Sequence, residues 1–226
     1  MISYESYRQA TNITKKTLYH DTLKGKILLT GYEPFLDFKR NPSLEACRLL
    51  EENDYHGYEV VVEELPMRYK EIRGLIRGLV DEHEPAAVIS TGVSSMASDI
   101  CVERVAINVG SADGGPNFGY DRLDQVLNPD GPVAYWSTLP IRDIVEAINK
   151  VNIPARISNS AGTQGCNLVF YHLMDYVAEK GLGIPAGFIH IPRFPENAVG
   201  TRNPSMSLVT SFKALEIAVN LVCSCL

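Results

Sequence analysis

The stretch KILLTGYEPFLDFKRNPSLEACRLLEEN, residues 26–53, joins a strand signal to a helix signal and indicates how the whole chain is built. Its first five residues form a short apolar run of the kind found in buried β-strands. Asn41 is a favourable helix N-cap, and Pro42 fits the first position of the helix that follows. Apolar residues then recur at the spacing of one helix face, at Leu44, Cys47 and Leu50. The stretch therefore predicts a strand followed by a helix.

The same alternation continues along the rest of the chain. Short apolar runs, most of them rich in β-branched residues, predict further strands at 59–65, 86–91, 104–109, 155–160 and 187–191. Helical periodicity predicts further helices at 68–83, at 139–150, after Cys166 and at 205–224. Strands that alternate with helices are typical of a sheet covered on both faces. We therefore expect an α/β fold.

The size of the chain favours a single domain. A chain of 226 residues, 45% of them hydrophobic, can bury one good-sized core. Residues 1–25 are weakly patterned, so we expect an N-terminal extension there, followed by the domain at 26–226. Residues 110–132 are rich in Gly, Asp, Asn and Pro and form a longer connection than most, which predicts a functional loop or lid.

Composition excludes several classes of protein. The net charge is −6 and the basic residues are scattered, so the sequence has no electrostatic footprint for nucleic acid or for an anionic membrane surface. We find no secretory signal pattern and no apolar run long enough to span a bilayer. The five cysteines form an odd set without metal-site spacing, which favours free thiols in a reducing compartment. We therefore expect a cytoplasmic protein whose partner is a small or neutral molecule.

Cys166 lies in the stretch SNSAGTQGCNLVFYHL, residues 158–173, where small residues give way to a helix. The first amides of a helix carry unpaired donors and the positive end of the helix dipole, and both favour a thiolate. Cys166 is therefore a candidate nucleophile. The alternative is a buried cysteine that packs as a small hydrophobic residue.

A cysteine nucleophile needs a base and a group that orients the base. His190 is the best candidate base, because GFIHIPRFPEN places it inside an apolar strand, where a polar ring must find a partner. Glu103 similarly enters an apolar strand in SDICVERVAINV. The alternatives are a satisfied core histidine at His190 and a salt bridge from Glu103 to Arg104. The other four histidines are interpreted as surface or packing residues.

Several blocks in one order resemble the pyroglutamyl peptidase I family, the pyrrolidone-carboxylate peptidases, which are cysteine peptidases. The blocks are TGYEPFLDFKRNPS, ERVAIN, GPVAYWSTLPI, the AGT-x-x-CN around Cys166, and GFIHIP at His190. Together they extend the resemblance over about residues 26–221. The resemblance implies a phosphorylase/hydrolase-like three-layer sandwich, with a mixed sheet and helices on both faces. It also implies a cytosolic enzyme that is a homo-oligomer, either a dimer or a tetramer.

The resemblance assigns roles to individual residues. It implies that Cys166 is the nucleophile, that His190 is the base and later the acid, and that Glu103 orients the imidazole. An aromatic clamp in the family holds the pyroglutamyl lactam ring. Phe35 matches one clamp position, and Tyr32 occupies the other, which is usually Phe. The implied reaction passes through a thioester and needs neither a metal nor an organic cofactor.

The sequence departs from the family pattern at three positions near the implied substrate site. Val93 stands where the family usually has Gln, Gln164 where it commonly has Phe, and Asp113 where it has an Arg credited with helping catalysis. Arg193 is a possible replacement for that cation, or else a solvated loop charge. We interpret Val93 and Gln164 as further substrate-binding positions.

Three functions follow from these residues. The first is a peptidase that removes an N-terminal pyroglutamyl residue from a peptide. The second is a cysteine amidase or amide-forming enzyme that acts on a different small acyl or lactam substrate, given the altered pocket. The third is a catalytically dead relative that serves as a binding protein, and the retention of Glu103, Cys166 and His190 argues against it.

Overall fold

The computed structural model describes residues 23–35, 39–51, 54–111 and 124–226. Most of the predicted N-terminal extension, most of the predicted loop at 110–132, and Asp113 therefore lie outside the described residues. Within the described residues, no helix is long and apolar enough to cross a membrane.

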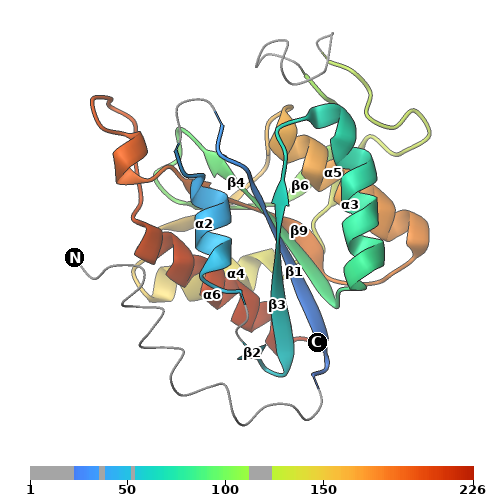
Figure 1. Ribbon diagram of the computed structural model, residues 1–226, viewed down its shortest axis with the longest axis horizontal. Helices are drawn as coiled ribbons and strands as arrows, with labels where there is room; N and C mark the ends of the chain where they lie inside the picture. The colour runs from blue at the N-terminus through green and yellow to red at the C-terminus, as the bar shows by residue number, and fades with distance from the viewer. Residues whose placement is uncertain (1–22, 36–38, 52–53, 112–123) are drawn as a thin grey trace.

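A seven-stranded mixed sheet forms the centre of the fold (Figure 1). Its strand order is β2-β3-β1-β4-β9-β5-β8. The four adjacent strands β3, β1, β4 and β9 are parallel to one another. At the edges, β2 runs antiparallel to β3, and β5 runs antiparallel to β9 but parallel to β8. The strands are β1 (Gly25–Tyr32), β2 (Asp54–Tyr55), β3 (Tyr58–Leu65), β4 (Ala87–Ser94), β5 (Ile100–Glu103), β8 (Ala155–Ser158) and β9 (Ala186–Pro192).

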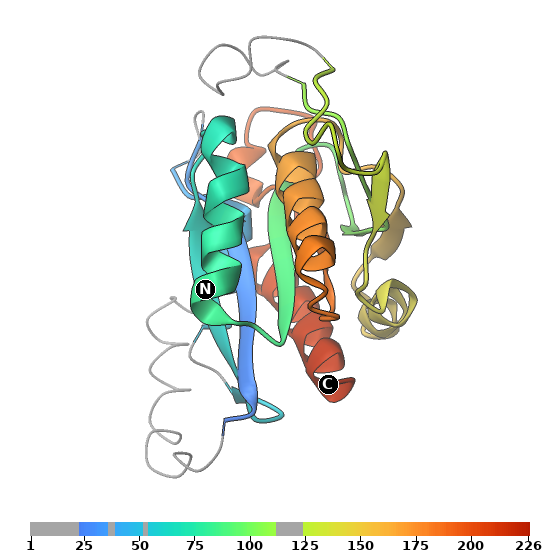
Figure 2. The same cartoon turned by 90° about the vertical axis from the view of Figure 1, so that its right-hand side faces the viewer.

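Helices cover both faces of this sheet, as Figures 1 and 2 show. One face packs against α3 (Tyr69–His83) and α5 (Gly165–Lys180). The other face packs against three helices, which are α2 (Pro42–Arg48), α4 (Ile141–Lys150) and α6 (Leu208–Ser224). A short 3-10 helix, η2 (Pro195–Asn197), follows β9. The expected three-layer α/β architecture is confirmed.

Alternate residues of the central strands enter the two cores. In β9, Phe188 packs in the core beneath α3 and α5, whereas Ile189 and Ile191 pack in the core beneath α2, α4 and α6. In β4, Val88 and Ile89 divide in the same way. Both faces are apolar because a sheet between two helix layers is buried on both sides. His190 and Phe188 are two residues apart, so His190 faces the layer of α3 and α5.

The sequence signals around α2 are confirmed at atomic level. The Asn41 side chain accepts a hydrogen bond from the Ser43 amide at 3.0 Å, and its own amide group donates to the Glu33 carbonyl at 2.9 Å. Pro42 is the first residue of the helix, as predicted. Asn41 thus caps α2 and also fixes the connection from β1, which places the loop after β1 close to the helix.

The predicted strand at 104–109 is wrong in its extent. The chain leaves the large sheet after Glu103, which ends β5, and only Val105–Ile107 continues as a strand, β6. β6 pairs antiparallel with β7 (Ala134–Trp136), a strand that the sequence did not predict, in a separate two-stranded sheet. The apolar pattern continues through both strands, so hydrophobicity alone cannot mark the point where the chain changes sheet.

We expect Asn41→Ala to lower the free energy of unfolding by about 1 kcal/mol, because the substitution removes the cap of α2. Urea denaturation of the two proteins measures this difference. Asn41→Asp keeps the capping oxygen and should lose less stability. Equal midpoints and slopes for Asn41→Ala and the unchanged protein would contradict the capping role.

Candidate active site

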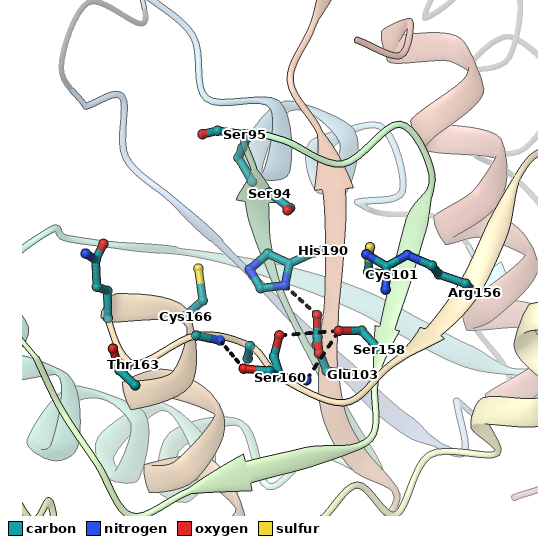
Figure 3. Close-up of a pocket in the computed structure, with 14 residues that line it drawn as sticks. Ser94, Ser95, Cys101, Glu103, Arg156, Ser158, Ser160, Thr163, Cys166 and His190 are labelled. Carbon is teal, nitrogen blue, oxygen red and sulfur yellow. Dashed lines mark hydrogen bonds and ion pairs between the residues drawn. The ribbon is translucent and has the colours of Figure 1, made fainter. Parts of the chain in front are cut away.

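Three chain segments bring a cysteine, a histidine and a carboxylate into one cavity (Figure 3). His190 lies in β9, Glu103 is the last residue of β5, and Cys166 is the second residue of α5. All three side chains line a cavity of about 400 Å³. The structure therefore brings together the three residues for which the sequence predicted catalytic roles.

Glu103 and His190 form a buried hydrogen-bonded pair. Glu103 Oε1 lies 2.8 Å from His190 Nδ1, and the two side chains are 1% and 8% exposed. The contact to Nδ1 fixes the orientation of the ring and leaves Nε2 as the nitrogen available to a third group. Arg104 is the other partner considered for Glu103, and it lies between the end of β5 and the start of β6. Its backbone amide donates a hydrogen bond to the Ser158 carbonyl.

The surroundings of His190 favour its protonated form. Burial by itself lowers the pKa of His190, but the charge and hydrogen bond of Cys166, together with those of Glu103, outweigh burial and raise the pKa to about 10. An imidazolium between a thiolate and a carboxylate is the resting arrangement expected of a cysteine nucleophile with its base.

Cys166 lies in the first turn of α5, as the sequence predicted. The helix begins at Gly165, and Gln164 is its N-cap but forms no side-chain capping hydrogen bond. The first intrahelical hydrogen bond runs from the Leu168 amide to the Gln164 carbonyl at 3.0 Å. The amides before Leu168 therefore have no partner within the helix, and the partly buried thiol belongs to one of these first residues.

Hydroxyl groups supply much of the remaining cavity wall, and the sequence analysis did not single them out. They come from the end of β4 and from the connection between β8 and α5, and they belong to Ser94, Ser95, Ser158, Ser160 and Thr163. The two runs of small polar residues that follow apolar strands, SS and SNSAGT, are the signal that could have indicated them.

The substrate-binding residues implied by the resemblance do not all line this cavity. Val93 and Gln164 do, whereas Tyr32 and Phe35 are not among its lining residues. Tyr32 is the buried last residue of β1, and burial followed by the charge of Cys166 raises its pKa well above the usual value. Phe35 is half-buried in the loop after β1. The clamp role of Tyr32 and Phe35 stays a prediction.

Arg193 acts on the backbone next to the cavity. Its Nε donates to the Ser95 carbonyl at 3.1 Å, and its Nη1 donates to the Asn197 carbonyl at 3.2 Å. Arg193 therefore links the segment after β4 to the segment after β9. Because the Arg193 guanidinium forms these two hydrogen bonds to the backbone, it is not simply a solvated charge.

Two buried thiols, Cys47 and Cys101, and the buried imidazole of His172 differ from the site residues. Burial raises the pKa of both the Cys47 and the Cys101 thiol to about 12, although Cys101 also lines the cavity. His172 is a packing residue, as expected, because it is buried in α5 and burial is the main cause that lowers its pKa to about 4. These groups stay neutral near pH 7.

The known proteins that this chain resembles are consistent with the geometry of the site. A family model described as pyroglutamyl peptidase matches residues 25–224. The pyrrolidone-carboxylate peptidase of Bacillus cytotoxicus is 40% identical over 194 residues, which is 85% of this chain and 90% of that protein. Pyrrolidone-carboxylate peptidase 1 of Caldanaerobacter subterraneus subsp. tengcongensis is 42% identical over 199 residues, which is 87% of this chain and 97% of that protein.

Solved structures agree with this fold over most of the chain. The crystal structure of pyroglutamyl peptidase I from Bacillus amyloliquefaciens matches with a TM-score of 0.85 and 38% identity, and covers 89% of this chain and 98% of that one. The pyrrolidone carboxyl peptidase from Thermococcus litoralis matches with a TM-score of 0.84 and 34% identity, and covers 88% of this chain and 94% of that one.

We expect an alkylating reagent at mildly acidic pH to modify Cys166 before Cys47 and Cys101. Cys166 is only partly buried and lies beside the imidazolium of His190 at the start of α5, whereas burial raises the pKa of the Cys47 and Cys101 thiols to about 12. Peptide mass mapping after brief treatment with iodoacetamide identifies the modified residue. Earlier modification of Cys47 or Cys101 would contradict the assignment of the nucleophile.

Proposed function

Because the chain belongs to the pyroglutamyl peptidase family, we propose that it is a cysteine peptidase that hydrolyses the amide bond after an N-terminal pyroglutamyl residue. The observation that carries this function is the placement of Cys166, His190 and Glu103 around one cavity at the start of α5.

In the first half of the reaction, the Cys166 thiolate attacks the acyl carbon of the scissile amide. A bond forms between sulfur and carbon, and the carbonyl electrons move to oxygen. When the tetrahedral intermediate collapses, the carbon–nitrogen bond breaks and the His190 imidazolium donates its proton to the leaving amine. The product is a pyroglutamyl thioester on Cys166 and a peptide shortened by one residue.

In the second half, water hydrolyses the thioester. His190 is now neutral and accepts a proton from the water molecule that attacks the acyl carbon. Free pyroglutamate leaves, and Cys166 returns to its resting form. Glu103 orients His190 throughout, because its contact with Nδ1 keeps Nε2 directed away from the carboxylate.

The start of α5 supplies stabilisation for the oxyanion. The Cys166 amide precedes the first intrahelical hydrogen bond, so its N–H has no partner within the helix. A backbone donor next to the nucleophile lies where negative charge develops on the carbonyl oxygen, and the helix dipole adds to its effect.

The alternative substrates have less support than pyroglutamyl peptides. The relatives named above are all pyrrolidone-carboxylate or pyroglutamyl peptidases, and they cover nearly the whole domain of this chain. Val93 and Gln164 are then variations in the cavity wall within one reaction type. Neither a cysteine amidase with another acyl group nor an inactive binding protein is favoured by a specific observation.

Assembly and cellular location also belong to the proposal. We expect a cytoplasmic enzyme that forms a dimer or tetramer, acts on small peptides or acyl amides, needs no cofactor, and binds neither nucleic acid nor membrane. These expectations rest on the sequence and the family resemblance. Light scattering coupled to size-exclusion chromatography measures the assembly directly.

We expect the reduced protein to release the chromophore from a chromogenic pyroglutamyl amide, and Cys166→Ala to lose at least about 10³-fold in rate. A prolyl amide, which has a similar ring without the lactam carbonyl, should stay intact and controls for ring recognition. No release by protein whose Cys166 still alkylates rapidly would overturn the pyroglutamyl substrate while retaining the nucleophile.

We expect Glu103→Gln to move the alkaline limb of kcat/KM to lower pH. Glu103 helps to raise the pKa of His190, so removal of its charge lowers that pKa, and the imidazolium then loses its proton at a lower pH. The maximum rate should also fall by about 10²- to 10⁴-fold, because the orienting contact is altered. An alkaline limb that does not move would show that Glu103 has no electrostatic effect on His190.

A further inference from the structure

Gly92 lies beside His190 on the same face of the sheet. The two residues are register partners in the parallel pair of β4 and β9. Val88 and Phe188, which precede them by four and two residues, pack in the core beneath α3 and α5. Because side chains alternate along a strand, a side chain at position 92 would extend toward α5, next to the imidazole.

The Cys166 sulfur lies where that side chain would be. A Cβ atom at Gly92 would be 2.8 Å from Cys166 Sγ and 2.9 Å from Phe188 Cζ. Carbon atoms in contact ordinarily stay about 3.5 to 4.0 Å from a neighbour, so both distances are too short. The thiol therefore occupies volume that exists only because position 92 has no side chain.

Backbone conformation does not explain this glycine. Its φ angle lies outside the left-handed region that favours glycine, since Gly92 is not among the residues with positive φ. Glycine within a strand costs stability and contributes no packing. The close approach of another group is the remaining physical reason for glycine at this position, and the structure identifies that group as the Cys166 thiol.

Phe188 closes the other side of the same space. Its ring is fully buried, and its centroid lies 4.8 Å from that of His190. The buried ring has little room to move, whereas the sulfur is the end of a short side chain that can rotate about one bond. An added methyl group at position 92 would thus displace the thiol rather than the ring.

We propose that Gly92 is a positioning residue whose missing side chain holds open the site from which the Cys166 thiol contacts His190. The role rests on the proposed function, in which these two residues are nucleophile and base. A methyl group at this position should rotate the sulfur away from the imidazole and break the contact between them. The backbones of β4 and α5 should not move.

The first test is the pH dependence of alkylation, which requires no substrate. We expect Gly92→Ala to lose the rapid reaction of Cys166 with iodoacetamide at mildly acidic pH and to react only as an ordinary thiol does, at higher pH. The kcat/KM for a pyroglutamyl amide should fall by about 10²-fold, mainly through kcat, because the nucleophile is misplaced by about 1 Å.

Gly78→Ala is the matched control. Gly78 is exposed in α3, and a Cβ there would have no neighbour within 4 Å. Alanine is also the better helix former, so this variant should fold at least as well and keep the alkylation profile of the unchanged protein. An unchanged profile for Gly92→Ala as well would overturn the proposal.

The second test compares melting temperatures and remains informative about the role of Gly92 even if Gly92→Ala folds poorly. We expect Gly92→Ala to lower the melting temperature more in the Cys166 protein than in Cys166→Ala, where the sulfur is absent and part of the clash is relieved. Equal losses in the two backgrounds, or failure of the double variant to fold, would overturn the proposal. The alkylation profile and the melting temperatures need no pyroglutamyl substrate, so failure of the proposed function is distinguishable from failure of this inference.

Discussion

The hydrogen bond between Glu103 and His190 is the interaction around which this end of the sheet is arranged. Burial of a carboxylate costs free energy of solvation unless the charge is paired. Within the described residues Glu103 Oε2 has no hydrogen-bond partner, so the contact of Oε1 with His190 offsets this cost. The pair forms where β5 runs antiparallel beside β9, with Cys101 opposite His190. The chain then leaves the sheet directly after Glu103, and the same segment continues as β6.

That segment also fixes the position of Cys166, the proposed nucleophile. Asn167, the residue after Cys166, is fully buried, and its side chain accepts from the Ile107 amide at 3.0 Å and donates to the Ile107 and Val109 carbonyls at 2.9 and 2.8 Å. The start of α5 is therefore tied to the chain immediately after the strand that supplies Glu103. These hydrogen bonds and the one between Glu103 and His190 together help to preserve the relative positions of Cys166, His190 and Glu103.

The cavity wall is less constrained than the three residues at its centre. Val93 follows the buried part of β4, and Gln164 precedes α5, so both can change without altering the sheet or the Cys166 position. The hydroxyl groups around them offer donors and acceptors to a peptide rather than a purely apolar surface. The fold therefore holds the three central residues more tightly than it holds this part of the wall.

The sequence by itself determined those features that depend on residues close together along the chain. The cap at Asn41, most of the apolar runs and the helix start at Cys166 are local, and their predictions were confirmed, whereas the run at 104–109 was wrong in its extent. The 1–25 boundary stays a prediction. Local environment and family resemblance together indicated Glu103 and His190, but their contact joins residues 87 positions apart. Only the tertiary structure decided that contact, the change of sheet after Glu103, and the space over Gly92 that holds the thiol. Strand pairing and packing between distant segments set all three, and no local pattern records them.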